Sequence, residues 1–227
     1  MCTLTWRNED DLEVFFNRDE LKTRSRAKPP REFKTEGGTR YLSPIDPDAG
    51  GTWMLANEHG LIICLLNRWH EETGTTFVKS RGQIVTELAD CSSLPEALNL
   101  LPTLCAGAKP FDLVAFHQEN LAGLSWLGDK TGAFEPQMPI TSSSYQFEKV
   151  KSARTKAFTQ YSSLEQFQDS QGQDSSAYTV RMNRPDAQTW SRSRLKVTST
   201  EIHWDYWEEY SNLEKEPTLH QISLALS

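Results

Sequence analysis

Short runs of apolar residues, separated by turn-forming residues, follow one another along most of this chain. The first is an alternating run over 2–6, which a polar turn at 8–11 connects to a second apolar run over 12–17. Alternation with a period of two is typical of strands with one buried face, so we expect a hairpin at the start of the chain. The same reasoning predicts further strands over these ranges: 52–56, 61–66, 112–116, 121–126, 178–182, 195–198 and 202–207.

Three segments have the spacing and the end signals of helices. The first is predicted over 81–90 and the last over 147–158. The middle helix is expected to begin after Ser93, a good N-cap residue, and Pro102 should kink or end it. Two long polar segments are predicted as loops: 21–50 and 162–177.

The order of these elements favours antiparallel sheets, because hairpins outnumber strand–helix–strand units. We expect a single domain over 1–227 of class α+β, with two sheets and the helices outside them. The run at 61–66 is apolar at every position, which is typical of a strand buried on both faces. It should therefore lie in the middle of its sheet.

The charge and composition of the chain exclude several classes of protein. With 24 Lys and Arg against 31 Asp and Glu, the formal net charge is −7, which argues against a nucleic-acid-binding surface. An aromatic content of 10% is more typical of a folded domain than of a disordered chain. No window is apolar enough for a membrane span, and the acidic start lacks the apolar stretch of a signal peptide. We therefore expect a cytoplasmic protein without a membrane span.

The cysteines and histidines give no metal or cofactor motif. The four cysteines form no CxxC pair, so neither a zinc site nor a thiol–disulfide motif is predicted. The five histidines share no ligand spacing. We expect no metal and no resident cofactor, and free thiols as in a reducing compartment.

Cys2 is the residue with the clearest chemical potential. A small second residue allows an aminopeptidase to remove Met1, which leaves a thiol and a free α-amine on one residue. An α-amine has a pKa of about 7.7–8.0, so it can act as the general base for that thiol near neutral pH. The alternative is that a small residue merely begins a strand here.

Two charged residues should lie near Cys2. The hairpin returns its second strand beside its first, which brings Arg18 and Asp19 close to the start of the chain. A guanidinium there would favour the thiolate and orient a substrate carbonyl or carboxylate. A carboxylate could bind the ammonium form of the α-amine. The alternative is an ordinary ion-pair cluster at a strand end, which would contribute little.

Several short motifs, in order, carry a resemblance to a known family. They are Met1-Cys2, Asn17-Arg18-Asp19-Glu20 followed by Arg24, Gly50-Gly51-Thr52-Trp53, Asn67 after an apolar strand, Ser80-Arg81-Gly82, and Lys109-Pro110-Phe111-Asp112-Leu113. With these residues the chain resembles the NRDE family, which is also called Transport and Golgi Organization 2. The match is strongest over the first 82 residues and weaker in the second half.

The resemblance implies a fold and a chemistry. The fold would be a four-layer αββα sandwich of two mainly antiparallel sheets, of the N-terminal-nucleophile hydrolase type. Relatives by fold include penicillin V acylases and bile-salt hydrolases, in which an N-terminal cysteine attacks an amide carbonyl with an arginine and an aspartate nearby. On this basis Cys2, Arg18 and Asp19 are the candidate catalytic residues, although those hydrolases space the arginine and aspartate further apart.

Other residues are candidates on weaker grounds. Asn67 ends an apolar strand and could donate a hydrogen bond to an oxyanion, or it could simply be a turn residue. The resemblance also suggests a substrate-binding role for Asn17, Arg24, Trp53 and Arg192. Trp53 could equally be a core residue, and Arg192 an ordinary surface arginine.

Two functions remain open from the sequence. The first is hydrolysis of an amide or thioester bond in a small acylated substrate, with Cys2 as the nucleophile. The second is non-enzymatic binding and trafficking of haem, an acyl lipid or acyl-CoA on the same fold. Both predict a small-molecule ligand that is anionic or acylated, and neither predicts an oligomeric state.

Overall fold

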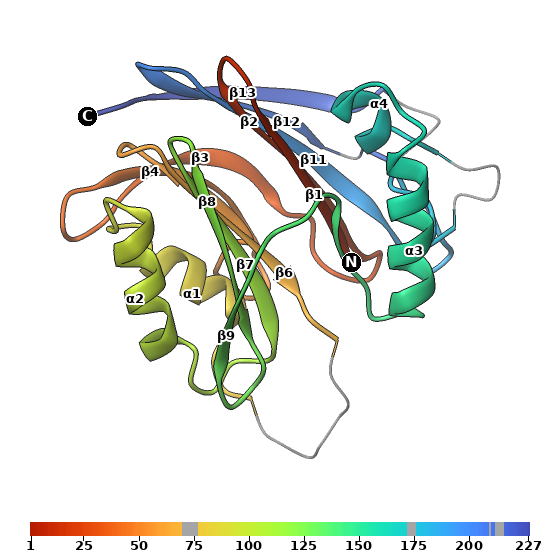
Figure 1. The fold of residues 1–227 in the computed structure, drawn as a ribbon, viewed down its shortest axis with the longest axis horizontal. Coiled ribbons are helices and arrows are strands. Elements are labelled where there is room, and N and C mark those ends of the chain that lie inside the picture. Colours follow the sequence, from red (N-terminus) through yellow and green to blue (C-terminus); the bar gives the residue numbers. More distant parts are fainter. Residues whose placement is uncertain (70–76, 172–175, 209, 212–215) are drawn as a thin grey trace.

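Two antiparallel β-sheets packed face to face form the centre of the molecule (Figure 1). The structure is a computed structural model that describes residues 1–69, 77–171, 176–208, 210–211 and 216–227. In these ranges one sheet has six strands, in the order β10 (Ile140–Ser142), β1 (Cys2–Asn8), β2 (Leu12–Leu21), β11 (Ala187–Val197), β12 (Glu201–Glu208) and β13 (Thr218–Ala225). The other has seven, in the order β3 (Lys28–Lys34), β4 (Arg40–Ile45), β5 (Met54–Asn57), β6 (Leu61–Asn67), β7 (Phe111–His117), β8 (Asn120–Trp126) and β9 (Thr131–Phe134).

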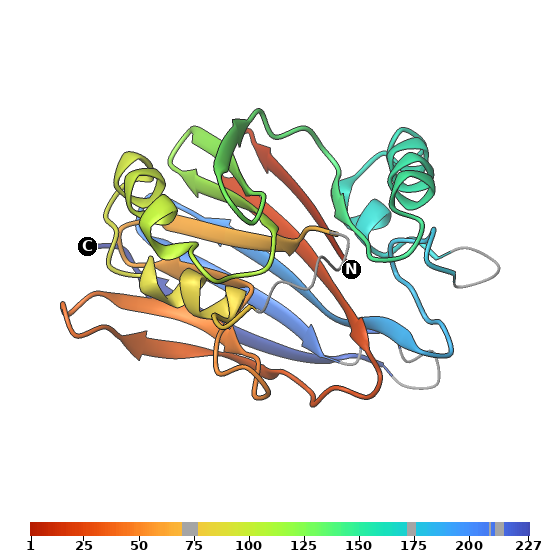
Figure 2. The same ribbon diagram turned by 90° about the horizontal axis from the view of Figure 1, so that it is seen from below.

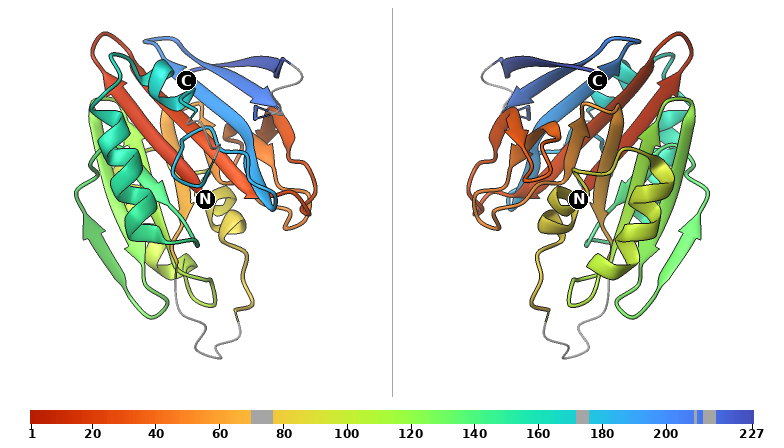
Figure 3. Two further views of the ribbon diagram at one scale, coloured as in Figure 1. Left: turned by 90° about the vertical axis from the view of Figure 1, so that its right-hand side faces the viewer. Right: turned by 90° about the vertical axis from the view of Figure 1, so that its left-hand side faces the viewer.

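Helices cover the outer faces of both sheets. The helices α1 (Arg81–Glu87) and α2 (Leu94–Leu104) pack on the seven-stranded sheet, whereas α3 (Phe147–Phe158) and α4 (Leu164–Gln168) lie over the six-stranded sheet. The views from below and from the two sides show the same succession of layers (Figure 2, Figure 3). The predicted α+β sandwich with four αββα layers is therefore confirmed. No helix in the described ranges is long and apolar enough to cross a membrane.

The alternation of buried side chains explains both cores of the sandwich. On β6, Ile62 and Cys64 face the core between the two sheets, and Ile63 and Leu65 face the core beneath α1 and α2. Successive side chains of a strand point to opposite faces, so a strand inside the sandwich must be apolar at every position. The prediction that the run at 61–66 is buried on both faces is confirmed.

Two strands lie where a long loop was predicted, so the expectation for 21–50 was wrong in part. They are β3 and β4, which pair with each other at the edge of the seven-stranded sheet. The two consecutive prolines in β3 concealed it, because proline cannot donate to a ladder. An edge strand tolerates them, and the pairing register shifts between Lys28 and Arg31, where the prolines lie.

Other boundaries also differ from the predictions. No strand forms over 178–182, whereas β11 begins at Ala187, eight residues before the predicted start at 195. The first half of β11 is a buried but polar central strand, which hydrophobic alternation cannot detect. The helix α4 lies within the predicted loop 162–177, of which residues 172–175 lie outside the described part of the chain. Pro102 does not end α2, which continues to Leu104.

Candidate active site

Cys2 begins β1 between two strands and faces the space between the sheets. Its backbone lies opposite Arg18 of β2 on one side and Ser142 of β10 on the other. Residues directly opposite each other in an antiparallel pair point to the same face, so the Cys2 thiol and the Arg18 guanidinium share one side of the sheet. Both residues are buried, with 7% and 5% of their surface exposed.

Met1 extends this ladder by one residue. Its amine donates to the Asp19 carbonyl oxygen (3.0 Å), and the Asp19 amide donates to the Met1 carbonyl oxygen (2.8 Å). Hydrogen-bonding direction alternates along a strand, so the Cys2 amide points away from β2, toward β10. Removal of Met1 would therefore place the new α-amine beside Ser142, on the opposite side of the Cys2 backbone from Arg18.

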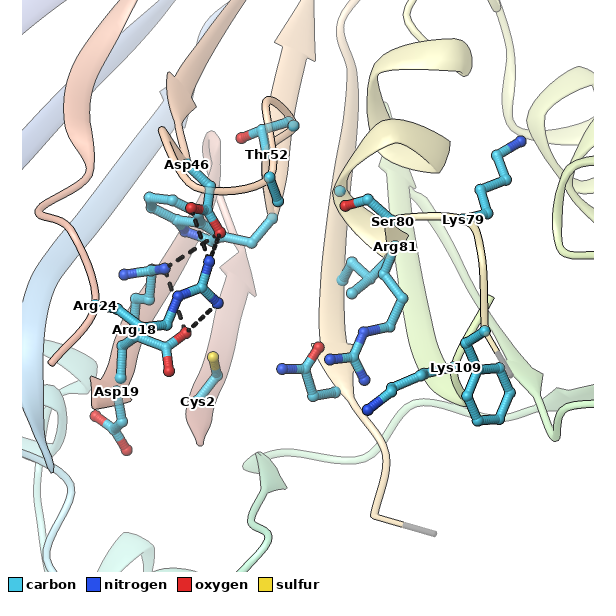
Figure 4. Close-up of a pocket in the computed structure, with 18 residues that line it drawn as sticks. Cys2, Arg18, Asp19, Arg24, Asp46, Thr52, Lys79, Ser80, Arg81 and Lys109 are labelled. Atoms are coloured by element: carbon cyan, nitrogen blue, oxygen red, sulfur yellow. Dashed lines mark hydrogen bonds and ion pairs between the residues drawn. The ribbon is translucent and has the colours of Figure 1, made fainter. Parts of the chain in front are cut away.

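A cavity of about 240 Å³ opens beside the thiol, between the ends of both sheets (Figure 4). It contains six of the eight predicted site residues: Cys2, Arg18, Asp19, Arg24, Trp53 and Asn67. Its remaining walls come from the loop before β5, the start of α1 and the segment before β7. The structure thus brings together residues from the first hairpin and from the seven-stranded sheet.

Arg18 is held in the cavity by an aromatic ring and two acids. Its guanidinium carbon lies 4.3 Å from the centre of the Trp53 ring, a cation–π distance. Its Nη2 lies 3.4 Å from Glu20 and 3.7 Å from Asp46. Arg24 shares those acids, at 3.3 Å from Glu20 and 2.7 Å from Asp46. Trp53 therefore orients Arg18, and the acids balance the charge of both arginines.

The Asp19 carboxylate is held from the opposite face of the sheet. It accepts from Arg154 Nη2 (3.0 Å) and from Thr189 Oγ1 (2.6 Å), and the Asp19–Arg154 ion pair is completely buried. Arg154 also donates to Thr3 (2.5 Å), so it connects α3 to both strands of the first hairpin. Sequence reasoning missed Arg154. Its one signal was a position four residues after the apolar Val150 on the same helix face.

Asn17 and Arg192 do not contribute to this cavity. They lie opposite each other on β2 and β11, on the face of the sheet that α3 and α4 cover. Asn17 donates to the Gln168 carbonyl oxygen (2.7 Å), and Arg192 donates to the Tyr210 hydroxyl (2.7 Å). Strand alternation explains the result, because the side chains next to Arg18 on β2 point to the other face of the sheet. The same holds for the carboxylate of Asp19, which binds Arg154 and Thr189 although the residue itself lines the cavity.

Two glycines bring the wall of the cavity together. The Gly51–Thr52 segment lies against the first turn of α1, where the Thr52 amide donates to the Gly82 carbonyl oxygen (3.1 Å). A Cβ on Gly51 would lie 2.3 Å from the Gly82 carbonyl carbon, so only glycine permits this approach. The contact brings together the two segments that carry Trp53 and Arg81, both of which line the cavity.

Three cations of the cavity were not assigned a role from the sequence: Lys79, Arg81 and Lys109. Lys79 pairs with Glu87 (2.7 Å), and its ammonium group points away from the cavity (Figure 4). Arg81 donates to the Pro110 carbonyl oxygen (3.2 Å), and burial lowers the pKa of its guanidinium. The motif that contains Arg81 was recognised, but nothing in the sequence placed it across from Cys2.

With Met1 in place, the surroundings of Cys2 favour its neutral thiol. Burial raises the pKa of Cys2 more than the N-terminal ammonium and Arg18 lower it, and Asp19 adds to the rise.

The other three cysteines are buried free thiols. Burial also raises the pKa of Cys91 and Cys105, each to about 11, so neither is reactive at neutral pH. In the described residues no group of three or more His, Cys, Asp or Glu is arranged to hold a metal ion.

Comparison with known proteins identifies the family and the fold. The family model described as "Transport and Golgi organisation 2" matches residues 1–211. A comparison with curated proteins gave no significant match. A conjugated bile acid hydrolase from Clostridium perfringens, solved as the C2A variant, has a TM-score of 0.59 and 14% identity, with 99% of this chain and 92% of that one covered.

Two further solved structures have the same architecture. The R18L variant of the same bile acid hydrolase has a TM-score of 0.58 at 13% identity, over 97% of this chain and 92% of that one. The Caenorhabditis elegans orthologue of N-acylethanolamine-hydrolyzing acid amidase has a TM-score of 0.55 at 8% identity, over 86% of this chain and 92% of that one. At these identities the likeness establishes the N-terminal-nucleophile hydrolase fold and not the reaction.

Proposed function

The chain belongs to the Transport and Golgi organisation 2 family, and from that premise we propose that it hydrolyses an amide or thioester bond in a small acylated substrate. Cys2 is the nucleophile in this proposal, after removal of Met1. The observation that carries it is the position of the thiol in a cavity, across the ladder from a buried arginine.

Each chemical step can be assigned to a group at this site. The neutral α-amine of Cys2 takes the thiol proton, and the sulfur forms a bond to the substrate carbonyl carbon. The carbonyl oxygen becomes an oxyanion, which Asn67 and Arg18 are available to stabilise. The bond to the leaving group then breaks as the α-ammonium returns its proton to the leaving amine or thiolate. Water adds to the acyl–sulfur carbonyl, and the carbon–sulfur bond breaks to release the acid.

The removal of Met1 matters for both the base and the thiol. While Met1 is present, its amine is hydrogen-bonded to Asp19, and the nitrogen of Cys2 is an amide that cannot accept a proton. After its removal, the α-amine belongs to Cys2 and lies one residue closer to the thiol. The free ammonium then lowers the pKa of the thiol from a shorter distance.

The solved relatives support this assignment by likeness. One is described as a conjugated bile acid hydrolase, and another as an acid amidase that hydrolyses N-acylethanolamines. The bile acid hydrolase was solved with changes at a cysteine numbered 2 and an arginine numbered 18, and this chain has the same residue types at these numbers. Structural likeness at 8–14% sequence identity does not identify the substrate of this chain.

The test begins with the intact mass of the purified protein. We expect a mass that lacks one methionine, followed by release of free acid from at least one member of a panel of N-acyl amino acids, N-acylethanolamines and acyl thioesters. The Cys2→Ala variant should release none. Retention of Met1 in an active preparation, or activity in Cys2→Ala, would contradict the proposed nucleophile.

Ligand binding without turnover is the second candidate function. The cationic lining of the cavity favours it, because such a lining suits an anionic ligand such as haem or acyl-CoA without any reaction at Cys2. In that case the Cys2→Ala variant would retain full affinity for the ligand, and no panel member would be consumed. Titration with haem and with acyl-CoA, each against Arg18→Ala, would identify this role.

A further inference from the structure

We propose that Arg81 and Lys109 form an anion-binding subsite opposite Cys2, and that the substrate carries a carboxylate or phosphate group near its scissile bond. This inference deepens the proposed function and rests on it for the identity of the scissile bond. The subsite itself depends only on the geometry and the charges of the cavity.

The positions of the two side chains support a shared subsite. Arg81 begins α1 and Lys109 precedes β7, and both line the cavity that holds the Cys2 thiol. Their head groups point to the same side of the cavity, toward the strands that carry Cys2 and Arg18 (Figure 4). Arg81 is fixed there by its hydrogen bond to the Pro110 carbonyl oxygen, one residue beyond Lys109.

Ion pairing distinguishes these two cations from the other cations of the cavity. Arg18 and Arg24 share Glu20 and Asp46, and Lys79 pairs with Glu87. Within the described part of the chain, neither Arg81 nor Lys109 forms an ion pair, and the acid that acts on Arg81 across the cavity is Glu20, which Arg18 and Arg24 already share. A partly buried guanidinium without a close ion-pair partner is unfavourable, and a bound anion would relieve that cost. The lowered pKa of Arg81 reflects the same desolvation.

The subsite also lies on the boundary with a second cavity. That cavity has a volume of about 390 Å³ and is lined by Met1 and the Ser142–Tyr145 segment. Arg81 and Lys109 line both cavities, and Met1 lines only the second. Loss of Met1 would therefore enlarge the second cavity toward Cys2. A substrate with its carbonyl at the thiol could then place an anionic group between the two cations.

Irreversible alkylation of Cys2 tests the subsite without any need for turnover. The probes are N-(iodoacetyl)glycine and N-(iodoacetyl)glycinamide, which differ only in carboxylate against carboxamide, and N-(iodoacetyl)aminomethylphosphonate as the phosphate analogue. In each reaction the Cys2 sulfur displaces iodide and the thiol proton is lost to the buffer. Intact mass measured against time gives the rate constant, and Cys2→Ser shows how much labelling occurs elsewhere.

The readout is the ratio of the anionic to the neutral rate constant. We expect a ratio of about ten or more for the carboxylate or the phosphonate probe, because charge-assisted hydrogen bonds are strong. Arg81→Gln and Lys109→Gln should each lower the ratio by about tenfold. The higher of the two anionic rates identifies which group the subsite prefers. Lys79→Gln is the matched control, since it removes one positive charge from the same wall, but from an ammonium group that pairs with Glu87 and points away from the cavity, and its ratio should equal that of the wild type.

Several outcomes would overturn the subsite. These are a wild-type ratio near one, a ratio that survives in both Arg81→Gln and Lys109→Gln, or an equal loss in Lys79→Gln. Lys109→Gln keeps the test available if Arg81→Gln fails to fold, because Lys109 is exposed. The two proposals fail separately. A high ratio of alkylation rate constants without any hydrolysis would support the subsite and contradict the proposed hydrolase. Hydrolysis with a ratio near one would support Cys2 as the nucleophile and contradict the subsite.

Discussion

Met1 and Asp19 exchange both of their main-chain hydrogen bonds, so the N-terminal methionine is paired as a strand residue next to Cys2. This pairing determines the direction in which the Cys2 nitrogen points. It also explains why the processing of one residue can change the chemistry of the whole cavity. Four changes to the chain test different parts of this arrangement.

The first prediction concerns the reactivity of Cys2 while Met1 is retained. A short N-terminal extension that blocks processing should leave the thiol slow toward iodoacetamide at neutral pH, because burial raises its pKa. Its rate should keep rising above the pH at which an unfolded thiol, with a pKa of about 8.5, has levelled off. Arg18→Gln should slow the reaction further, since the guanidinium lowers that pKa.

The same shift has a consequence for stability. The folded pKa of Cys2 lies above the unfolded one, so the contribution of the neutral thiol is fully present below the unfolded pKa. It is lost as the pH rises through the folded pKa. The difference in the free energy of unfolding between the extended protein and its Cys2→Ala variant, measured by urea denaturation, should therefore stay constant below the unfolded pKa. On the alkaline side the extended protein should lose stability relative to the variant. Alkylation of the extended protein as fast as that of a urea-unfolded sample would contradict both expectations.

The second prediction concerns the buried pair of Asp19 and Arg154. Arg154→Met should lower the free energy of unfolding by about 3–5 kcal/mol, because it leaves the Asp19 carboxylate buried without its cation. Urea denaturation measures the loss. Arg184→Met is the matched control, since Arg184 pairs with the half-exposed Asp186 and such pairs contribute less than about 1 kcal/mol. The Arg154→Met/Asp19→Leu double variant should recover part of the loss, and equal losses in the two single arginine variants would refute the assignment.

The third prediction concerns the glycine contact that closes the cavity wall. Gly82→Ala would place a Cβ 2.9 Å from the Thr52 nitrogen and 3.0 Å from its oxygen, so backbone must move. We expect a loss of about 1–3 kcal/mol, although the same change within an ordinary helix stabilises it by up to about 1 kcal/mol. Gly132→Ala is the control, because nothing lies within 4 Å of its Cβ position. A stabilised Gly82→Ala protein would show that the contact is loose.

Much of this arrangement could be predicted from local pattern, and some could not. The hairpin that places Arg18 opposite Cys2 follows from two alternating runs around a polar turn, a short-range signal. Arg81 and Lys109 come from the side of the seven-stranded sheet. The periodicity of apolar residues predicts single strands and helices, but it does not predict how two sheets pack against each other. The partner of Asp19 is 135 residues away in sequence, so no spacing rule could find it.

The misplacement of Asn17 and Arg192 has a different origin. The strand containing Asn17 and Arg18 was predicted, and its alternation already requires the two side chains to face opposite sides of the sheet. The resemblance to a family motif grouped adjacent residues as one site, although the geometry of a strand separates them. When a motif lies on a strand, its residues should therefore be sorted by the face of the sheet to which each side chain points before roles are assigned.

The last prediction concerns Asn67, the candidate oxyanion donor at the end of β6. Its side chain is exposed to the cavity and makes no hydrogen bond within the described part of the chain, so Asn67→Ala should leave the free energy of unfolding within about 0.5 kcal/mol of the wild type. If it stabilises the oxyanion, kcat should fall about 10²–10³-fold. Asn57 provides the contrast.

Asn57 is completely buried, and its side chain donates to the carbonyl oxygens of Ala89 (3.0 Å) and Cys91 (2.7 Å). Asn57→Ala should therefore lower stability by about 1–3 kcal/mol, because buried acceptors lose their donors. Rate constants come from the substrate identified in the acylated panel, and stabilities from urea denaturation of the same preparations. If Asn67→Ala keeps its kcat while its stability falls, Asn67 is a turn residue and the oxyanion must be stabilised by Arg18 or by the backbone.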